Sequence, residues 1–85
     1  MSDDAANEPE LELIYIAGKL DEAQRIEALL EQHQIDYDVR VEQYRAGFIF
    51  VSVRAGAFFY VLPDAAARSR EILSGLGYRV QEPLL

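Results

Sequence analysis

The chain has 85 residues, of which 51% are hydrophobic and 27% charged, and it contains no cysteine and no tryptophan. This length fits one small domain, and the lack of cysteine excludes disulfide bonds, thiolate metal sites and a cysteine nucleophile. The net charge of −7 comes mainly from residues 1–12, which carry five acids and no base. The rest of the chain is nearly balanced, which disfavours non-specific binding to nucleic acid or to an anionic membrane.

The N-terminal segment is acidic and polar, whereas a secretory signal is basic and then apolar, and no apolar run is long enough to span a membrane. We therefore expect a cytoplasmic protein without membrane contact. Residues 1–10 are expected to form a disordered acidic tail, because they lack periodicity and large apolar groups beyond the initiator. Residues 11–82 are expected to form a single α+β domain, followed by a C-terminal tail at 83–85.

The first half of the domain predicts a strand, a helix and a second strand. Residues 11–17 are rich in β-branched and aromatic side chains and end at Gly18, as strands do. From Leu20 to Leu30, apolar residues recur at helical spacing with charged residues on the other side. Residues 35–41 alternate in polarity and predict a half-buried edge strand. One face of this strand would carry Tyr37, Val39 and Val41.

The second half predicts two further strands, at 48–53 and 57–62, joined by a turn at Ala55-Gly56. A second helix is predicted after Pro63, with Asp64 as its N-cap. Two glycines, Gly75 and Gly77, would end this helix in a left-handed C-cap. Residues 78–81 would form a short last strand.

This order of elements predicts a ferredoxin-like βαββαβ two-layer sandwich with an additional central hairpin strand. Its sheet would be mostly antiparallel, with two helices on one face. Such a sandwich leaves the other sheet face to solvent, yet three predicted strands are apolar on both faces. In the first strand, for example, Leu13 and Tyr15 lie on one face, and Ile14 and Ile16 on the other.

Several aromatic side chains on the second face would exceed the largest apolar patch of a typical monomer, which is about 300–600 Å². We therefore expect this face to be covered, in the first place by self-association. The alternatives are cover by the chain's own tails and binding of a foreign protein or ligand. The predicted interaction surface has seven members: Tyr15, Arg40, Tyr44, Arg45, Phe48, Phe50 and Arg54.

The three arginines of this surface lie in or beside the central strands, where they could orient a partner or hold a small anionic effector. We expect Phe48→Asp or Phe50→Asp to change assembly or solubility far more than the fold. Simple unfolding by either substitution would instead place the side chain in the core.

No residue pattern predicts catalysis, a cofactor or a metal. His33 is the sole histidine, and no acid or nucleophile stands at a spacing that suggests a proton relay. The chain has no glycine-rich phosphate loop and no set of metal ligands. We expect a non-enzymatic protein. The alternative is an enzyme whose catalytic groups are His33 and a carboxylate, and in that case His33→Ala would abolish its activity.

An alternative function is binding of single-stranded RNA. Residues 47–53 resemble the octamer of the RNA recognition motif family, and residues 14–20 resemble its hexamer with one insertion. This resemblance implies base stacking on Tyr15, Phe48 and Phe50. The chain departs from the octamer at Ala46, Ile49 and Val53, so nucleic acid is the less favoured partner.

A broader resemblance covers residues 13–76. Its first part is Tyr15-Ile16-Ala17, Glu22-Ala23, Leu29-Leu30-Glu31, Ile35, Val39-Arg40 and Glu42, and its second part begins with Val61-Leu62-Pro63-Asp64 and continues along the helix that follows. In these stretches the chain resembles the DUF2007 family of small bacterial signal-transducing proteins.

The DUF2007 resemblance implies a ferredoxin-like domain distantly akin to the nitrogen-regulatory PII proteins, which trimerise through their sheets and sense effectors at subunit boundaries. The chain lacks the long loop and the phosphate-binding residues of PII, so ATP binding is not implied. Residue patterns and resemblance together predict a small regulatory or interaction domain. It would act in signal transduction by self-association, or by binding a protein or effector, through the sheet face.

Overall fold

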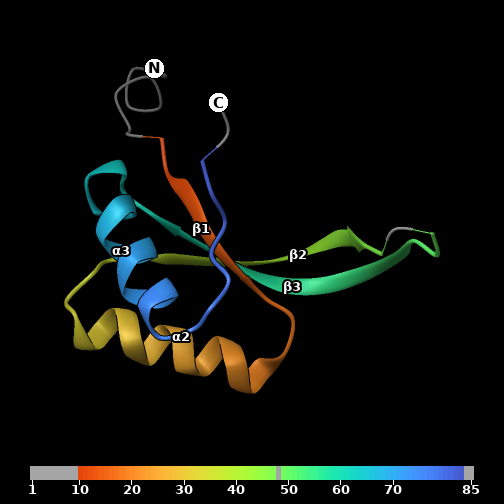
Figure 1. Ribbon diagram of the computed structural model, residues 1–85, viewed down its shortest axis with the longest axis horizontal. Coiled ribbons are helices and arrows are strands. Elements are labelled where there is room, and N and C mark those ends of the chain that lie inside the picture. The colour runs from red at the N-terminus through yellow and green to blue at the C-terminus, as the bar shows by residue number, and fades with distance from the viewer. Residues whose placement is uncertain (1–9, 48, 84–85) are drawn as a thin grey trace, which may run out of the picture.

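The structure is a computed structural model that describes residues 10–47 and 49–83 (Figure 1). Its elements, in chain order, are β1 (Glu12–Ala17), α2 (Leu20–Gln32), β2 (Asp38–Ala46), β3 (Ser52–Val61) and α3 (Pro63–Gly75). The three strands form one antiparallel sheet in the order β1-β3-β2. The prediction of an α+β fold with an antiparallel sheet and two helices is confirmed.

The core lies between the two helices and one face of the sheet. Phe59 and Val61 project from the central strand β3 and are fully buried, as are Ile26 and Leu30 of α2 and Leu73 of α3. Burying an aliphatic or aromatic side chain of this size stabilises a fold by about 1.5–3 kcal/mol. The face that carries Phe59 is called the helix-facing side below, and the opposite face is called the open face.

The predicted edge strand is confirmed in its position and in its faces. β2 is the last strand of the sheet, and its register pairs Val39 with Phe59 and Val41 with Ala57, so both valines are on the helix-facing side. Arg40 pairs with Phe58 and therefore lies on the open face. The strand begins three residues later than predicted, at Asp38.

A bulge in β1 changes the predicted alternation of that strand. Leu13 is opposite Tyr60 and Tyr15 is opposite Phe59, so Ile14 is an extra residue in β1. Because a bulge interrupts the period of two, the neighbours Ile14 and Tyr15 are both buried. The assignment of Leu13 and Tyr15 to one face is therefore wrong.

The additional central hairpin strand is also wrong. The sequence predicts strands at 48–53 and 57–62, whereas β3 is one strand that passes without a turn through Ala55 and Gly56. The residue at this mid-strand position is a glycine because the ring of Tyr44 packs over it and leaves no room for a Cβ atom. The hairpin turn follows Gly47 instead, whose φ of 105° favours glycine.

The expected last strand is absent from the described residues. In the segment after α3, the amide of Gln81 donates a hydrogen bond of 2.8 Å to the carbonyl of Ile14 in β1. One such bond does not make a ladder, and Pro83 has no amide hydrogen with which to extend it. The described chain therefore has the element order βαββα.

The limits of α3 differ slightly from the prediction. Leu62 is the N-cap and Pro63 is the first helical residue, so Asp64 lies in the first turn and not at the cap. Proline suits this position because its φ is already helical. The left-handed helix end predicted at Gly77 is confirmed by its φ of 96°; Gly75 is the last helical residue and Leu76, between them, is the C-cap. Over the described residues, neither helix is long and apolar enough to cross a membrane.

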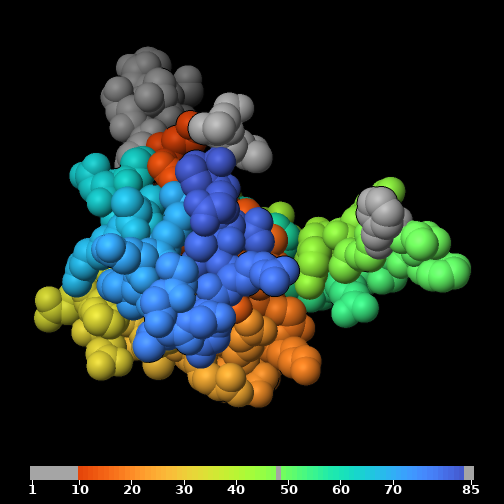
Figure 2. All heavy atoms as spheres, in the orientation of Figure 1, coloured from red at the N-terminus to blue at the C-terminus, as the bar shows by residue number. Residues whose placement is uncertain are grey.

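The far halves of β2 and β3 extend beyond the helices as a projecting ribbon, coloured green in Figure 1. The same projection stands clear of the rest of the molecule in the space-filling view (Figure 2). We call residues 41–47 and 49–55 the hairpin arm. Since no helix lies under most of the arm, its side chains do not belong to the core.

Candidate interaction surface

The open face of the sheet carries a cluster of half-buried aromatic and aliphatic side chains. Phe58 and Tyr60 of β3 lie beside Ile16 and Leu13 of β1, as the strand register requires. The Tyr44 ring meets Phe58 edge to face, with ring centroids 5.9 Å apart. Aromatic pairs favour this arrangement.

Side chains of β2 cover part of the open face. The Arg40 guanidinium lies over the Tyr60 ring, 4.8 Å from its centroid, and Arg40 also pairs with Asp38 at 2.9 Å. Burial raises the pKa of the Tyr60 hydroxyl above its usual value, and Glu42 adds to this shift. The apolar second face predicted from the sequence is therefore partly shielded by the sheet's own residues.

The most exposed large hydrophobic side chains gather on the hairpin arm. Phe50 is 90% exposed and Val41 79% exposed, and Ile49, Val51 and Val53 are also exposed. Covering aromatic and aliphatic groups in such a position with another surface removes them from water, which is favourable. Close to Val41, the N-terminal end of α2 adds the exposed side chain of Leu20.

The predicted surface residues do not come together in one place. Arg54 is opposite Tyr44 on the open face, whereas Arg45 is opposite Val53 and lies on the helix-facing side. Arg40 shares the open face with Arg54 but pairs with Asp38. The three arginines thus do not converge on one anion. Phe48 lies outside the described residues.

Tyr15 does not belong to an exposed surface. It is 4% exposed, its hydroxyl donates a hydrogen bond to Glu22 of α2, and its ring meets Tyr78 edge to face at 5.8 Å. Phe50, by contrast, lies at the tip of the hairpin arm. Because Tyr15 faces the helices, it cannot act with Phe50 as a platform for stacked bases.

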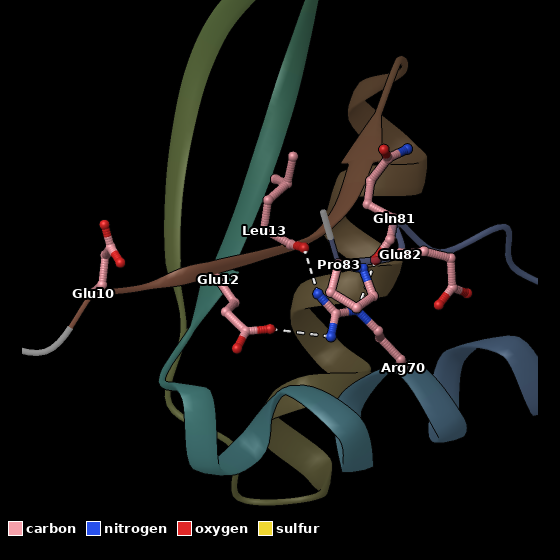
Figure 3. A pocket seen from close by; sticks show the side chains of 7 residues that line it. All are labelled: Glu10, Glu12, Leu13, Arg70, Gln81, Glu82 and Pro83. Carbon is pink, nitrogen blue, oxygen red and sulfur yellow. Dashed lines mark hydrogen bonds and ion pairs between the residues drawn. The ribbon is translucent and has the colours of Figure 1, made fainter. Parts of the chain in front are cut away.

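A hollow with a volume of about 470 Å³ is lined by Arg70 and several acids (Figure 3). The Arg70 guanidinium donates to the carbonyls of Gln81 at 2.7 Å and Leu13 at 3.0 Å, and to the Glu12 carboxylate at 3.1 Å. These contacts join α3, β1 and the C-terminal segment. Arg70 is therefore a structural clamp, with three of its five N–H donors engaged.

The described residues contain no group of three or more acidic or histidine side chains placed to hold a metal ion. His33 is the C-cap residue of α2, and its carbonyl accepts a hydrogen bond of 3.2 Å from Arg68. The contact of His33 with Arg68 is therefore one that a carbonyl at a helix end makes.

A search against protein-family models, curated proteins and solved structures found no match to this chain. Membership of the DUF2007 family therefore stays a prediction that rests on the residues quoted above.

Sequence reasoning missed four exposed residues of the arm: Val41, Ile49, Val51 and Val53. None of them was among the seven residues of the predicted interaction surface. The signal was present in the polar run Glu42-Gln43 after Val41, which is typical of a strand that leaves the core. Such a run does not reveal how far the helices extend under the sheet. The extent of the helices decides which valines are exposed.

Proposed function

We propose that this protein is a non-catalytic regulatory or interaction domain that acts by self-association through the hairpin arm. The observation that carries the proposal is the gathering of exposed apolar side chains on this arm, with Phe50 90% exposed at its tip. In a monomer, apolar side chains on a ribbon outside the core do not stabilise the fold. Removing that ribbon from water on association is favourable by about 25 cal/mol per Å² of apolar surface.

The proposal differs from the sequence-based one in the surface it uses. Open-face residues such as Phe58 and Tyr60 are half-buried, whereas Val41 and Phe50 of the arm contribute little to the core. The arm therefore has more apolar surface to lose on association than the open face. A role in signal transduction, as in the DUF2007 resemblance, would follow if an upstream event changed the association.

We also propose that the fold is ferredoxin-like. Two observations support it: the sheet order β1-β3-β2, and the C-terminal segment beside β1, where Gln81 bonds to Ile14. An outer strand in this position would complete the βαββαβ order. Isotope-edited measurement of amide exchange at residues 79–82 would test it, because a strand protects alternate amides.

The proposed function is tested by the solution mass of the full chain, measured by light scattering across a micromolar concentration series. We expect an oligomer that dissociates on dilution, and we expect Phe50→Asp to shift dissociation to higher concentration. Leu76→Asp is the matched control, because Leu76 is an exposed hydrophobic residue outside the arm. A monomer at every concentration would exclude the proposal, as would equal effects of the two substitutions.

A further inference from the structure

The outer edge of β2 is an open template for pairing. β2 ends the sheet, and within the described residues its backbone pairs with β3 alone. It is nine residues long, and Val41 near its centre is 79% exposed. A strand edge of this length presents unpaired amides and carbonyls that another strand can satisfy.

We propose that the occupant of this edge is the β2 strand of a second copy, paired antiparallel about a twofold axis at Val41. This inference rests on the proposed self-association and places Val41, the exposed arm residue nearest the body of the molecule, at its centre. The two three-stranded sheets would then join into one continuous sheet. A twofold axis makes the interface isologous, so each contact occurs twice.

Charge complementarity fixes the register. With Val41 opposite itself, Arg40 of one copy is opposite Glu42 of the other, and the symmetry repeats this pair. Residues 38–44 of each copy fall opposite one another, all within β2. Both ion pairs lie on the open face, and the two Val41 side chains meet on the helix-facing side. Directly opposite residues of unlike charge stabilise an antiparallel pair.

Neighbouring registers lack this complementarity. Centring the axis on Arg40 or on Glu42 places that residue opposite its own copy, which brings like charges together. Centring it on Val39 overlaps only residues 38–40 of β2. Centring it on Gln43 leaves no ion pair and sets Val41 against Arg45.

The charges beside the two ends of β2 also fit an antiparallel partner. Near the start of the strand, the Tyr37 hydroxyl donates a hydrogen bond of 2.6 Å to Glu31. In the proposed register Arg45 of the second copy lies opposite Tyr37, and so comes near the Glu31 carboxylate. Arg45 at the far end of one strand thereby meets an acid of α2 beside the start of the other.

Cysteine substitution tests the register directly, because the chain has no cysteine of its own. In Val41→Cys the two thiols would be opposite each other, with Cβ atoms about 4.5–5.5 Å apart, which a disulfide can bridge after a small adjustment. In the control Gln43→Cys the two thiols would be about 13 Å apart. Both positions are exposed, so neither substitution disturbs the core.

We expect oxidation to give a covalent dimer for Val41→Cys and at least tenfold less for Gln43→Cys at equal concentration. A charge exchange tests the ion pairs independently. Arg40→Glu should raise the dissociation constant about tenfold, and adding Glu42→Arg should restore it. The double variant still lacks the contact of Arg40 with Asp38, so recovery isolates the contact between copies.

These outcomes separate this inference from the proposed function. An oligomer by light scattering, with equal cross-linking at both positions or no effect of Arg40→Glu, would overturn β2 pairing and leave self-association in place. A monomeric chain that forms no covalent dimer would overturn both. Selective cross-linking together with charge-exchange rescue would establish the register.

Discussion

The ring of Tyr44 on β2 lies against the backbone of Gly56 on β3, on the open face of the sheet. A Cβ atom at Gly56 would stand 2.8 Å from Cε1 of Tyr44 and 3.0 Å from Cγ2 of Ile16. Glycine is therefore required by close packing and not by backbone conformation. The contact holds Tyr44 inward at the point where the hairpin arm leaves the body of the molecule.

We expect Gly56→Val to lower the free energy of unfolding by about 1–3 kcal/mol, because the branched side chain overpacks the contact with Tyr44. Urea denaturation followed by circular dichroism measures this change. Gly75→Ala is the control, since no atom lies within 4 Å of a Cβ there and alanine favours a helix. That variant should be slightly stabilised, and equal losses in both variants would contradict the packing argument.

A second prediction concerns the clamp made by Arg70. Arg70→Met keeps most of the aliphatic stem but removes the donors to Leu13, Gln81 and Glu12. Leaving these partly buried acceptors without a partner should cost about 1–3 kcal/mol of stability. The Gln81 amide should also exchange faster with solvent, as hydrogen exchange measured by NMR would report.

The matched control for the clamp is Arg25→Met. Arg25 pairs with Asp21 at 2.9 Å on an exposed helix surface, where an ion pair contributes about 0.5 kcal/mol or less. A loss at Arg70 no greater than the loss at Arg25 would show that the clamp is unimportant.

Local sequence patterns predicted the two helices, β1 and the edge position of β2 well. Helical periodicity from Leu20 and the proline at Pro63 depend on nearby residues, so a single sequence contains them. The alternation of Val39 and Val41 likewise placed both on the side that faces the helices. These are the features in which local preference and tertiary packing agree.

The hairpin and the interaction surface were predicted less well, because both depend on distant contacts. Gly56 is typical of a turn, and only the ring of Tyr44 on a different strand shows why it lies in mid-strand. Because of the bulge at Ile14, Tyr15 faces the helices and does not lie on the predicted surface. Phe50, by contrast, is exposed because the arm extends beyond the helices.

The end of α2 supports a third prediction. Gln34 adopts a left-handed backbone with a φ of 59°, and the next amide, that of Ile35, donates to the Leu30 carbonyl at 2.9 Å. This is the same helix end that Gly77 makes after α3, where glycine carries no steric penalty. Gln34→Gly should raise the free energy of unfolding by up to about 1 kcal/mol.

Thermal and urea denaturation of Gln34→Gly would measure this gain, and Gly77→Ala is its counterpart, for which we expect a loss of similar size. A gain from Gln34→Gly without a loss from Gly77→Ala would mean that the two helix ends are not equivalent.

The last prediction concerns alkaline stability and the hydroxyl of Tyr15. Burial raises the pKa of this hydroxyl above its ordinary value, and the hydrogen bond to Glu22 raises it further. The folded state then keeps a proton that the unfolded chain releases above about pH 10. Stability from this group is complete below that pH and is lost as the pH rises further.

We expect the free energy of unfolding to fall above about pH 10, with Tyr15 contributing about 1.4 kcal/mol per pH unit. Urea denaturation at a series of alkaline pH values measures the slope, which Tyr15→Phe should reduce by that amount. Glu22→Gln should keep most of the slope, because burial is the larger cause. Equal slopes in the wild type and Tyr15→Phe would mean that the Tyr15 hydroxyl titrates as freely in the folded state as in the unfolded chain.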